Sequence, residues 1–169
     1  YGPNGGVVPG LAAHWFANDN ATRWTFRLFE GLQWSDGTPL NAEDIVWSAR
    51  RIVDPASTFA QIGDFYSVLN APEVLRQEAP PEAMGVRALD PLTVEFEMTA
   101  PISFFPLLMR EFYPFPRHAI EAHGSGWTRP ENFVGCGPFL VSGAGALSLQ
   151  LRRNRLARNP ARIENVHIE

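Results

Sequence analysis

Residues 31–44 read Gly-Leu-Gln-Trp-Ser-Asp-Gly-Thr-Pro-Leu-Asn-Ala-Glu-Asp, and this stretch is the most informative part of the chain for the fold. Its Ser-Asp-Gly-Thr-Pro segment predicts a turn in which Gly37 supplies a positive φ. Asn41 is a good N-cap, and Asp44 three residues later completes the pattern of a capping box. We therefore expect a turn that leads directly into a helix over 42–53. The apolar residues at helical spacing predict the buried stripe of this helix: Ile45, Ala49, Ile52 and Val53.

Alternating apolar and polar residues on both sides of this stretch predict antiparallel strands. Before it, Trp24, Phe26 and Leu28 fall on one face of a strand. After it, residues 86–88 and 92–98 flank an Asp-Pro turn, which predicts a hairpin. The second strand of this hairpin would be half-buried, with one apolar and one charged face.

Weaker patterns complete a mixed α/β arrangement of helices and strands. Residues 7–12 predict only a short extended piece that enters a turn. Three short helices are expected, over 59–69, 103–110 and 116–123. Three strands are expected near the end of the chain, at 138–141, at 147–152 and around Val166 and Ile168.

Composition excludes several classes of protein. The chain has 169 residues, of which 45% are hydrophobic, so it is globular and not a disordered tail. Its net charge of −4 disfavours nucleic-acid binding, which usually needs a basic surface. A single cysteine, Cys136, cannot form an internal disulfide or, alone, a zinc site. No apolar run is long enough to span a membrane.

Motifs for catalysis are missing from the sequence. His118 and His123 are five residues apart, which is not the spacing of a helical zinc pair. The sequence lacks a nucleotide-binding glycine loop and a nucleophile elbow, and all fourteen basic residues are arginine, so no lysine chemistry is available. We therefore expect no enzyme activity, no cofactor and no metal.

Two compositional features leave alternatives open. Five tryptophans and twelve phenylalanines could build a core or line a ligand cleft. The arginines near the end of the chain could bind nucleic acid, but a solvated face or a contact to further protein is favoured because the rest of the chain is acidic. These arginines are Arg152, Arg153, Arg155, Arg158 and Arg162.

Three blocks of residues together resemble a known family. The first block comprises Pro-Gly-Leu-Ala-Ala-His-Trp at 9–15, Trp-Thr-Phe-Arg-Leu at 24–28 and the stretch 31–44 quoted above. The second is Asp-Pro-Leu-Thr-Val-Glu-Phe at 90–96, followed by Ala-Pro. The third is Val-Gly-Cys-Gly-Pro-Phe at 134–139, with Arg-Asn downstream. In this order they resemble the family 5 extracellular solute-binding proteins, which are the peptide and nickel receptors of bacterial ABC importers.

The resemblance implies a periplasmic-binding-protein fold of type II and an internal fragment of a receptor about three times longer. Residues 1–117 would form the small extra domain with a mixed sheet, and residues 118–169 would belong to an incomplete first lobe. The implied function is capture of peptides or similar small solutes by closure of two lobes. The implied location is the periplasm, or the cell surface through a lipid anchor outside these residues. Its partners would be the ligand and the importer membrane subunits, with no nucleic acid.

The resemblance also suggests three ligand-binding residues. Phe59 corresponds to a position where an aromatic ring approaches the ligand; the alternative is core packing. Arg110 follows an apolar run where some relatives place an arginine that could pair with a carboxylate; the alternative is a surface arginine. Cys136 lies in a turn that faces the lobe interface in relatives; the alternative is a small buried side chain.

The sequence departs from the family pattern at three places. Phe29 replaces the usual arginine, Cys136 the usual threonine, and Arg-Leu-Ala-Arg at 155–158 replaces a proline and a Tyr-Trp pair.

A second functional class stays open, because the same fold could be the sensor domain of a transcription regulator with a DNA-binding segment upstream.

Overall fold

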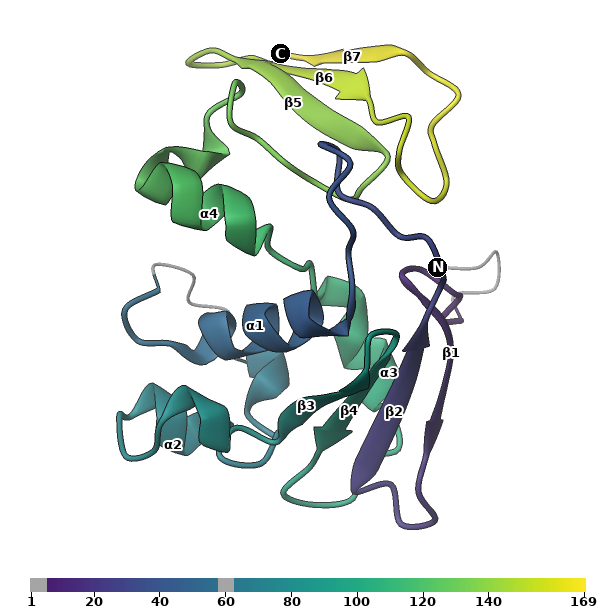
Figure 1. Ribbon diagram of the computed structural model, residues 1–169, viewed down its shortest axis with the longest axis vertical. Helices are drawn as coiled ribbons and strands as arrows, with labels where there is room; N and C mark the ends of the chain where they lie inside the picture. The colour runs from purple at the N-terminus through teal and green to yellow at the C-terminus, as the bar shows by residue number, and fades with distance from the viewer. Residues whose placement is uncertain (1–5, 58–62) are drawn as a thin grey trace. The chain divides into compact units, whose positions relative to one another are not determined.

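The computed structural model describes residues 6–57 and 63–169 of the chain. They form two compact units (Figure 1). The first unit comprises Tyr1–Glu30 and Asn41–Pro114, and the second comprises Gly31–Leu40 and Phe115–Glu169. The chain thus leaves the first unit, returns to it and leaves it again. The expected receptor domains, 1–117 and 118–169, stay a prediction.

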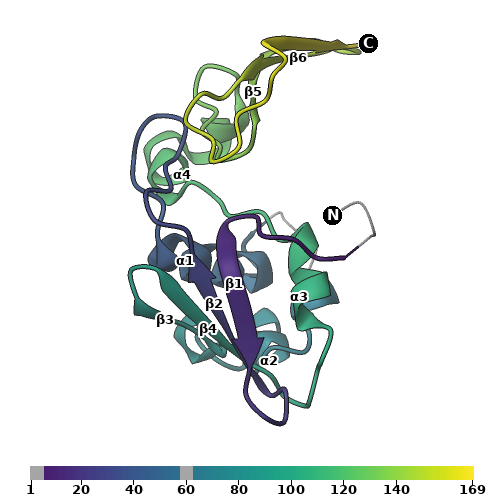
Figure 2. The ribbon, with the colours of Figure 1, turned by 90° about the vertical axis from the view of Figure 1, so that its right-hand side faces the viewer.

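A four-stranded antiparallel sheet forms the centre of the first unit. Its strand order is β1-β2-β4-β3, in which β1 is Ala12–Ala17, β2 is Arg23–Leu28, β3 is Val86–Asp90 and β4 is Thr93–Glu97. Figure 2 shows β1 at one edge of this sheet, next to β2. The predicted hairpin is therefore confirmed as β3 and β4, and the alternation in β2 places its apolar residues in the core.

Helices of the first unit bury the apolar face of the sheet. The longest, α1 (Ala42–Val53), packs against β3 and β4. The other helical segments are short: η1 (Gly63–Phe65), α2 (Ala71–Leu75), η2 (Pro81–Ala83), α3 (Phe105–Leu108) and η3 (Met109–Glu111). Phe105 of α3 makes edge or tilted ring contacts with Phe26 and Phe96 from the sheet. Aromatic pairs of this kind contribute about 0.5–1.5 kcal/mol each beyond the area that they bury.

Local sequence determines α1 almost completely. The side chain of Asn41 accepts a hydrogen bond from the backbone N–H of Glu43, and Asp44 Oδ2 accepts one from the backbone N–H of Asn41. This is the predicted capping box. The four residues of the predicted stripe are buried, so the bounds, the cap and the face of this helix are all confirmed.

The second unit combines a short hairpin, a helix and a small sheet. Within Gly31–Leu40, the backbone N–H of Trp34 donates to Thr38, and that of Leu40 donates to Leu32. Helix α4 (Arg117–His123) is followed by the 3₁₀ helix η4 (Gly124–Thr128). The sheet is antiparallel with the order β5-β6-β7, and its strands are β5 (Phe139–Ala144), β6 (Leu149–Arg153) and β7 (Asn165–Ile168).

Three expectations need correction. Residues 12–17 form β1, whereas the sequence predicted only a short extended piece over 7–12 that enters a turn. Pairing with β2 orders a sequence whose own alternation is weak. The helix expected over 59–69 is wrong in its described part, where the bridge of Val68 to Met98 uses the backbone for sheet pairing after η1. Thr93 and Glu95 on the charged face of β4 are also buried, because the strand is internal to the sheet and Arg87 extends over Glu95, whereas Glu97 on that face is half-buried.

No helix in the described part of the chain combines the length and the apolar character needed to cross a membrane.

Candidate functional site

The first and third sequence blocks meet in the second unit. The backbone N–H of Ser35 donates to the carbonyl oxygen of Gly135 at 3.0 Å, and the N–H of Gly135 donates to Ser35 Oγ at 3.2 Å. These reciprocal bonds attach the 31–40 hairpin to the turn that leads into β5. Residues about one hundred positions apart are therefore held in register by their backbones.

Asn154, from the third block, completes this arrangement. Its side chain is 2% exposed, and its Nδ2 donates to the carbonyl oxygen of Gly137 at 2.9 Å. Its Oδ1 accepts the backbone N–H of Leu156 at 3.0 Å, and its own backbone N–H donates to Pro138. A buried amide with these partners fixes two loops at once, because a buried polar side chain is stable only when its hydrogen bonds are made.

The turn residues of the first block contact helix α4. His118 Nε2 lies 2.7 Å from Asp36 Oδ2, and the imidazole makes an edge contact with the fully buried ring of Trp34. Burial by itself would raise the pKa of Asp36, but hydrogen bonds from Thr38 and from His118 outweigh it and hold this pKa below its ordinary value. Asp36 is therefore a carboxylate at neutral pH, and it anchors both the turn and the helix.

The second block forms a turn in the first unit. Asp90 Oδ1 accepts the backbone N–H of Leu92 at 2.8 Å, and Asp90 Oδ2 accepts the hydroxyl of Thr93. These bonds, with the nearby charge of Arg27, lower the pKa of the exposed Asp90 carboxyl. In each of the three blocks, polar motif residues thus hold turns and loops in place: Ser35 and Asp36, Asp90, and Asn154.

The three predicted ligand-binding residues differ in where they lie and in what surrounds them. Phe59 lies outside the described residues. Arg110 is in η3, exposed, and forms an ion pair with Glu111 at 3.0 Å. Cys136 is half-buried in the turn between Gly135 and Gly137, beside the bonds that hold the 31–40 hairpin. Arg110 belongs to the first unit and Cys136 to the second.

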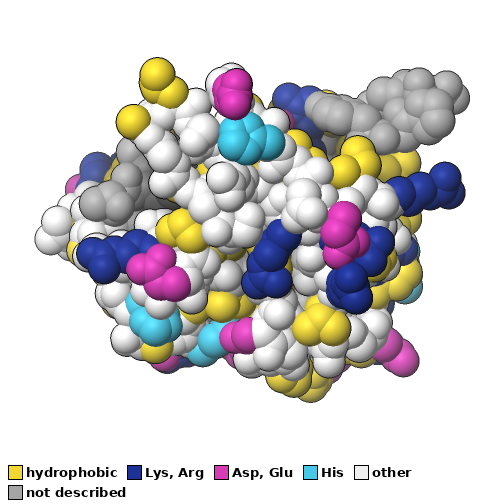
Figure 3. Space-filling view, turned by 90° about the horizontal axis from the view of Figure 1, so that it is seen from above, with side chains coloured by type: hydrophobic (Ala, Val, Ile, Leu, Met, Phe, Trp, Pro, Cys, Tyr) yellow, Lys and Arg dark blue, Asp and Glu magenta, His cyan; other side chains and the backbone are white. Residues whose placement is uncertain are grey.

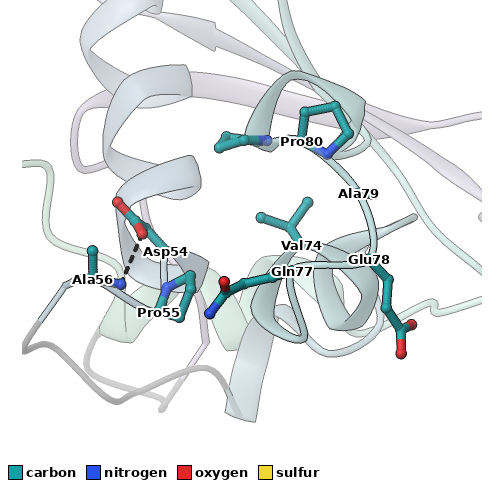
Figure 4. Close-up of a pocket in the computed structure, with 9 residues that line it drawn as sticks. Asp54, Pro55, Ala56, Val74, Gln77, Glu78, Ala79 and Pro80 are labelled. Carbon is teal, nitrogen blue, oxygen red and sulfur yellow. Dashed lines mark hydrogen bonds between the residues drawn. The ribbon is translucent and has the colours of Figure 1, made fainter.

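An open groove with a volume of about 640 Å³ lies at the C-terminal end of α1. One wall is the turn at 54–56 and the other is the loop at 77–81 (Figure 4). Val74 of α2 lies between the walls, while the carboxylate of Glu78 is turned away. Among the described residues that line it, Asp54 accepts the backbone N–H of Ala56 and only the amide of Gln77, beside Pro55, adds a further polar group, so few polar anchors for a specific ligand are present.

Metal chemistry has no support in residues 6–57 and 63–169, which contain no cluster of three or more His, Cys, Asp or Glu side chains arranged to hold an ion.

Comparison with known proteins assigns the chain to a family. Residues 6–169 match the model of the bacterial extracellular solute-binding proteins, family 5 Middle, so the chain belongs to this family. Among curated relatives, it is 37% identical over 140 residues to the periplasmic murein peptide-binding protein MppA of Escherichia coli, and 37% identical over 142 residues to the periplasmic oligopeptide-binding protein OppA of that organism. These matches cover 81% and 82% of the chain but only 26% of each relative.

Solved structures agree with the sequence relatives. The OppA structure from Burkholderia pseudomallei superposes with a TM-score of 0.92 at 30% identity, covering 96% of this chain and 33% of that chain. The Haemophilus influenzae OppA complex with RPPGFSPFR superposes with a TM-score of 0.84 at 29% identity, covering 95% and 33%. The periplasmic-binding-protein fold is therefore confirmed, and the chain spans about a quarter to a third of these relatives.

Proposed function

We propose that this chain is part of the substrate-binding subunit of an ABC importer that captures peptides or similar small solutes. The observation that carries the proposal is the family match across residues 6–169, together with relatives named for peptide binding in the periplasm. None of the relatives named above supports the alternative of a transcription regulator. The same relatives are binding proteins, which supports a role without catalysis and a location outside the cytoplasm.

The physical basis of such a function is differential binding of two conformations. A ligand that bridges two lobes binds the closed form more tightly than the open form and so shifts the population towards closure. Peptide backbones offer the same donors and acceptors at every residue, so generic hydrogen bonds and hydrated pockets allow broad specificity. This mechanism needs rigid units, and the interlocked bonds of Ser35, Gly135 and Asn154 provide rigidity within the second unit.

Arg110 remains our candidate for pairing with a ligand carboxylate, with Phe59 and Cys136 as further candidates for contact with the ligand. Two properties support Arg110: its side chain is exposed, and its ion pair with the adjacent Glu111 is one that an incoming carboxylate could replace. Exposed ion pairs contribute about 0–1 kcal/mol, so the exchange would cost little.

The test uses the full-length receptor, freed of bound ligand by unfolding and refolding. Calorimetry with a mixture of short peptides should show binding at micromolar or lower concentration, and mass spectrometry should identify the retained peptides. The isolated 169-residue chain should bind them weakly or not at all, because it spans only about a third of the solved relatives. A receptor that binds no small solute and stays in the cytoplasm would contradict the proposal.

A paired variant tests Arg110 separately. Arg110→Gln should weaken binding of peptides with a free C-terminal carboxylate by about ten- to a hundredfold, the range for a hydrogen bond to a charged group. C-terminally amidated peptides should bind the variant and the wild type equally. Arg129→Gln, which also removes an exposed arginine, serves as the control. Equal losses for both peptide types would remove Arg110 from the site without affecting the wider proposal.

A further inference from the structure

The arginine loop, which we define as residues 152–164, has a charge opposite to that of the rest of the chain. It contains five arginines and one glutamate, whereas the remaining residues contain nine basic and seventeen acidic side chains. All five arginines lie within a span of eleven residues that ends β6 and forms the connection to β7. A cluster of like charges within a chain of opposite net charge is more typical of a surface that binds a partner than of one that contacts only solvent.

The arginine loop is closed at its base by its own glutamate. The backbone N–H of Arg153 donates to the carbonyl oxygen of Glu164 at 2.7 Å. The Glu164 carboxylate binds Arg153 Nη2 through one oxygen at 3.0 Å and Arg155 Nη2 through the other at 2.9 Å. With the buried amide of Asn154 fixing the first residue after β6, the ends of the loop are held in place before any partner binds.

The outer part of the arginine loop combines cationic and apolar side chains. Arg158 and Arg162 are exposed, as are two apolar residues: Leu156 at 43% and Ile163 at 61%. Figure 3 shows basic side chains on one face of the molecule, with hydrophobic and acidic side chains beside them. Helices that bind at a membrane interface combine basic and apolar side chains in the same way.

We propose that the arginine loop binds the surface of an anionic phospholipid membrane. Guanidinium groups bind phosphate oxygens through two parallel hydrogen bonds, which an anionic headgroup layer offers at high density. A membrane surface needs no complementary shape in the loop that binds it, whereas an acidic protein surface would need one. Leu156 and Ile163 then enter the boundary of the acyl region, and the acidic remainder of the chain is repelled, which orients the molecule with the loop towards the lipid.

Vesicle sedimentation of the 169-residue chain tests this directly. At neutral pH and low salt (~50 mM), the chain should bind vesicles that contain a quarter of phosphatidylglycerol and should not bind vesicles of phosphatidylcholine alone. At high salt (~500 mM) most of the binding should disappear, because screening shortens the reach of the charges to a few ångströms. Equal binding to anionic and neutral vesicles would overturn the proposal. Failure to bind anionic vesicles would also overturn it, and is the outcome expected if the partner is an acidic protein.

Matched variants locate the surface. Arg158→Gln with Arg162→Gln should weaken binding about fivefold for each arginine removed, so about twenty-five-fold together, because each arginine near an anionic surface contributes about 1 kcal/mol. Both substitutions leave the Arg153–Glu164–Arg155 base intact. Arg117→Gln with Arg129→Gln makes the same charge change in the same unit and should leave binding unchanged. Equal effects of the two pairs would contradict a role for the loop.

A third variant separates insertion from adsorption. Ile163→Ser removes an exposed apolar side chain and no charge. It should lower vesicle binding several-fold and should abolish whatever binding persists at high salt, since apolar burial is not screened. Circular dichroism checks that each variant is folded. Because vesicle binding needs no peptide and no importer, this proposal can fail while the proposed function stands, and the reverse also holds.

Discussion

His118 Nε2 lies 2.7 Å from Asp36 Oδ2, and this contact joins helix α4 to a turn more than eighty residues earlier in the chain. The same turn carries Trp34, whose ring is fully buried against the imidazole. A sequence block that reads as a simple turn therefore also supplies the long-range contacts that assemble the second unit.

Asp36→Asn should make unfolding of the chain depend less on pH in the acidic range. The pKa of Asp36 is lowered in the folded state, so this carboxylate stabilises the fold above its unfolded value of about 3.8, and the stabilisation is lost as pH falls through the lower folded value. Since the group is partly exposed, the variant should lose only about 1 kcal/mol or less at pH 7. Urea unfolding at pH 7 and below pH 3 should show this difference shrinking towards zero; a constant difference would contradict it.

Asn154→Ala should be one of the more damaging single changes in the second unit. It removes the partly buried hydrogen bonds to the carbonyl of Gly137 and from the N–H of Leu156, which should cost about 1–3 kcal/mol of unfolding free energy. Asn154→Asp keeps the acceptor for Leu156 but places a carboxylate against a carbonyl oxygen, so it should also destabilise. The exposed Asn159 provides the control: Asn159→Ala should change the denaturation midpoint very little.

Gly85→Ala should destabilise the first unit for a steric reason. An added Cβ would lie 2.8 Å from the carbonyl oxygen of Glu97 and 2.8 Å from the Cβ of Leu69, and neither the strand nor its neighbour can move freely. Overpacking of this kind costs about 1–3 kcal/mol. At Gly10 an added Cβ would meet nothing, so Gly10→Ala is the comparison. Equal melting temperatures for the two variants would show that the Gly85 contact is relaxed in solution.

Asn41→Ala should destabilise α1 by about 1 kcal/mol, because the N–H of Glu43 loses its capping acceptor. Asn41→Ser should recover most of the loss, since serine is an equally good cap. Chemical denaturation monitored by circular dichroism measures both. An alanine variant as stable as the wild type would indicate that burial of the helix, and not its cap, determines the bounds of α1.

Elements whose information is local were predicted well from the sequence. Helix α1 was predicted with its bounds, cap and buried face, because the capping box and the apolar stripe are encoded within a dozen residues. The hairpin of β3 and β4 and the final strand β7 follow from alternation beside turn residues. Strand β1 was missed and Glu95 was assigned to an exposed face, because partners elsewhere in the chain decide both pairing and burial.

The sequence by itself determined the family, the α/β class and the order of most elements, because motifs, caps and periodicity act over short distances. Only the tertiary structure decided that residues 31–40 join the C-terminal unit, that Asp36 meets His118, and that Glu164 closes the arginine loop. Those contacts depend on loop closure over tens of residues and on which buried donors and acceptors find each other. Local patterns in the sequence do not show which distant residues meet, because those contacts depend on how the whole chain folds.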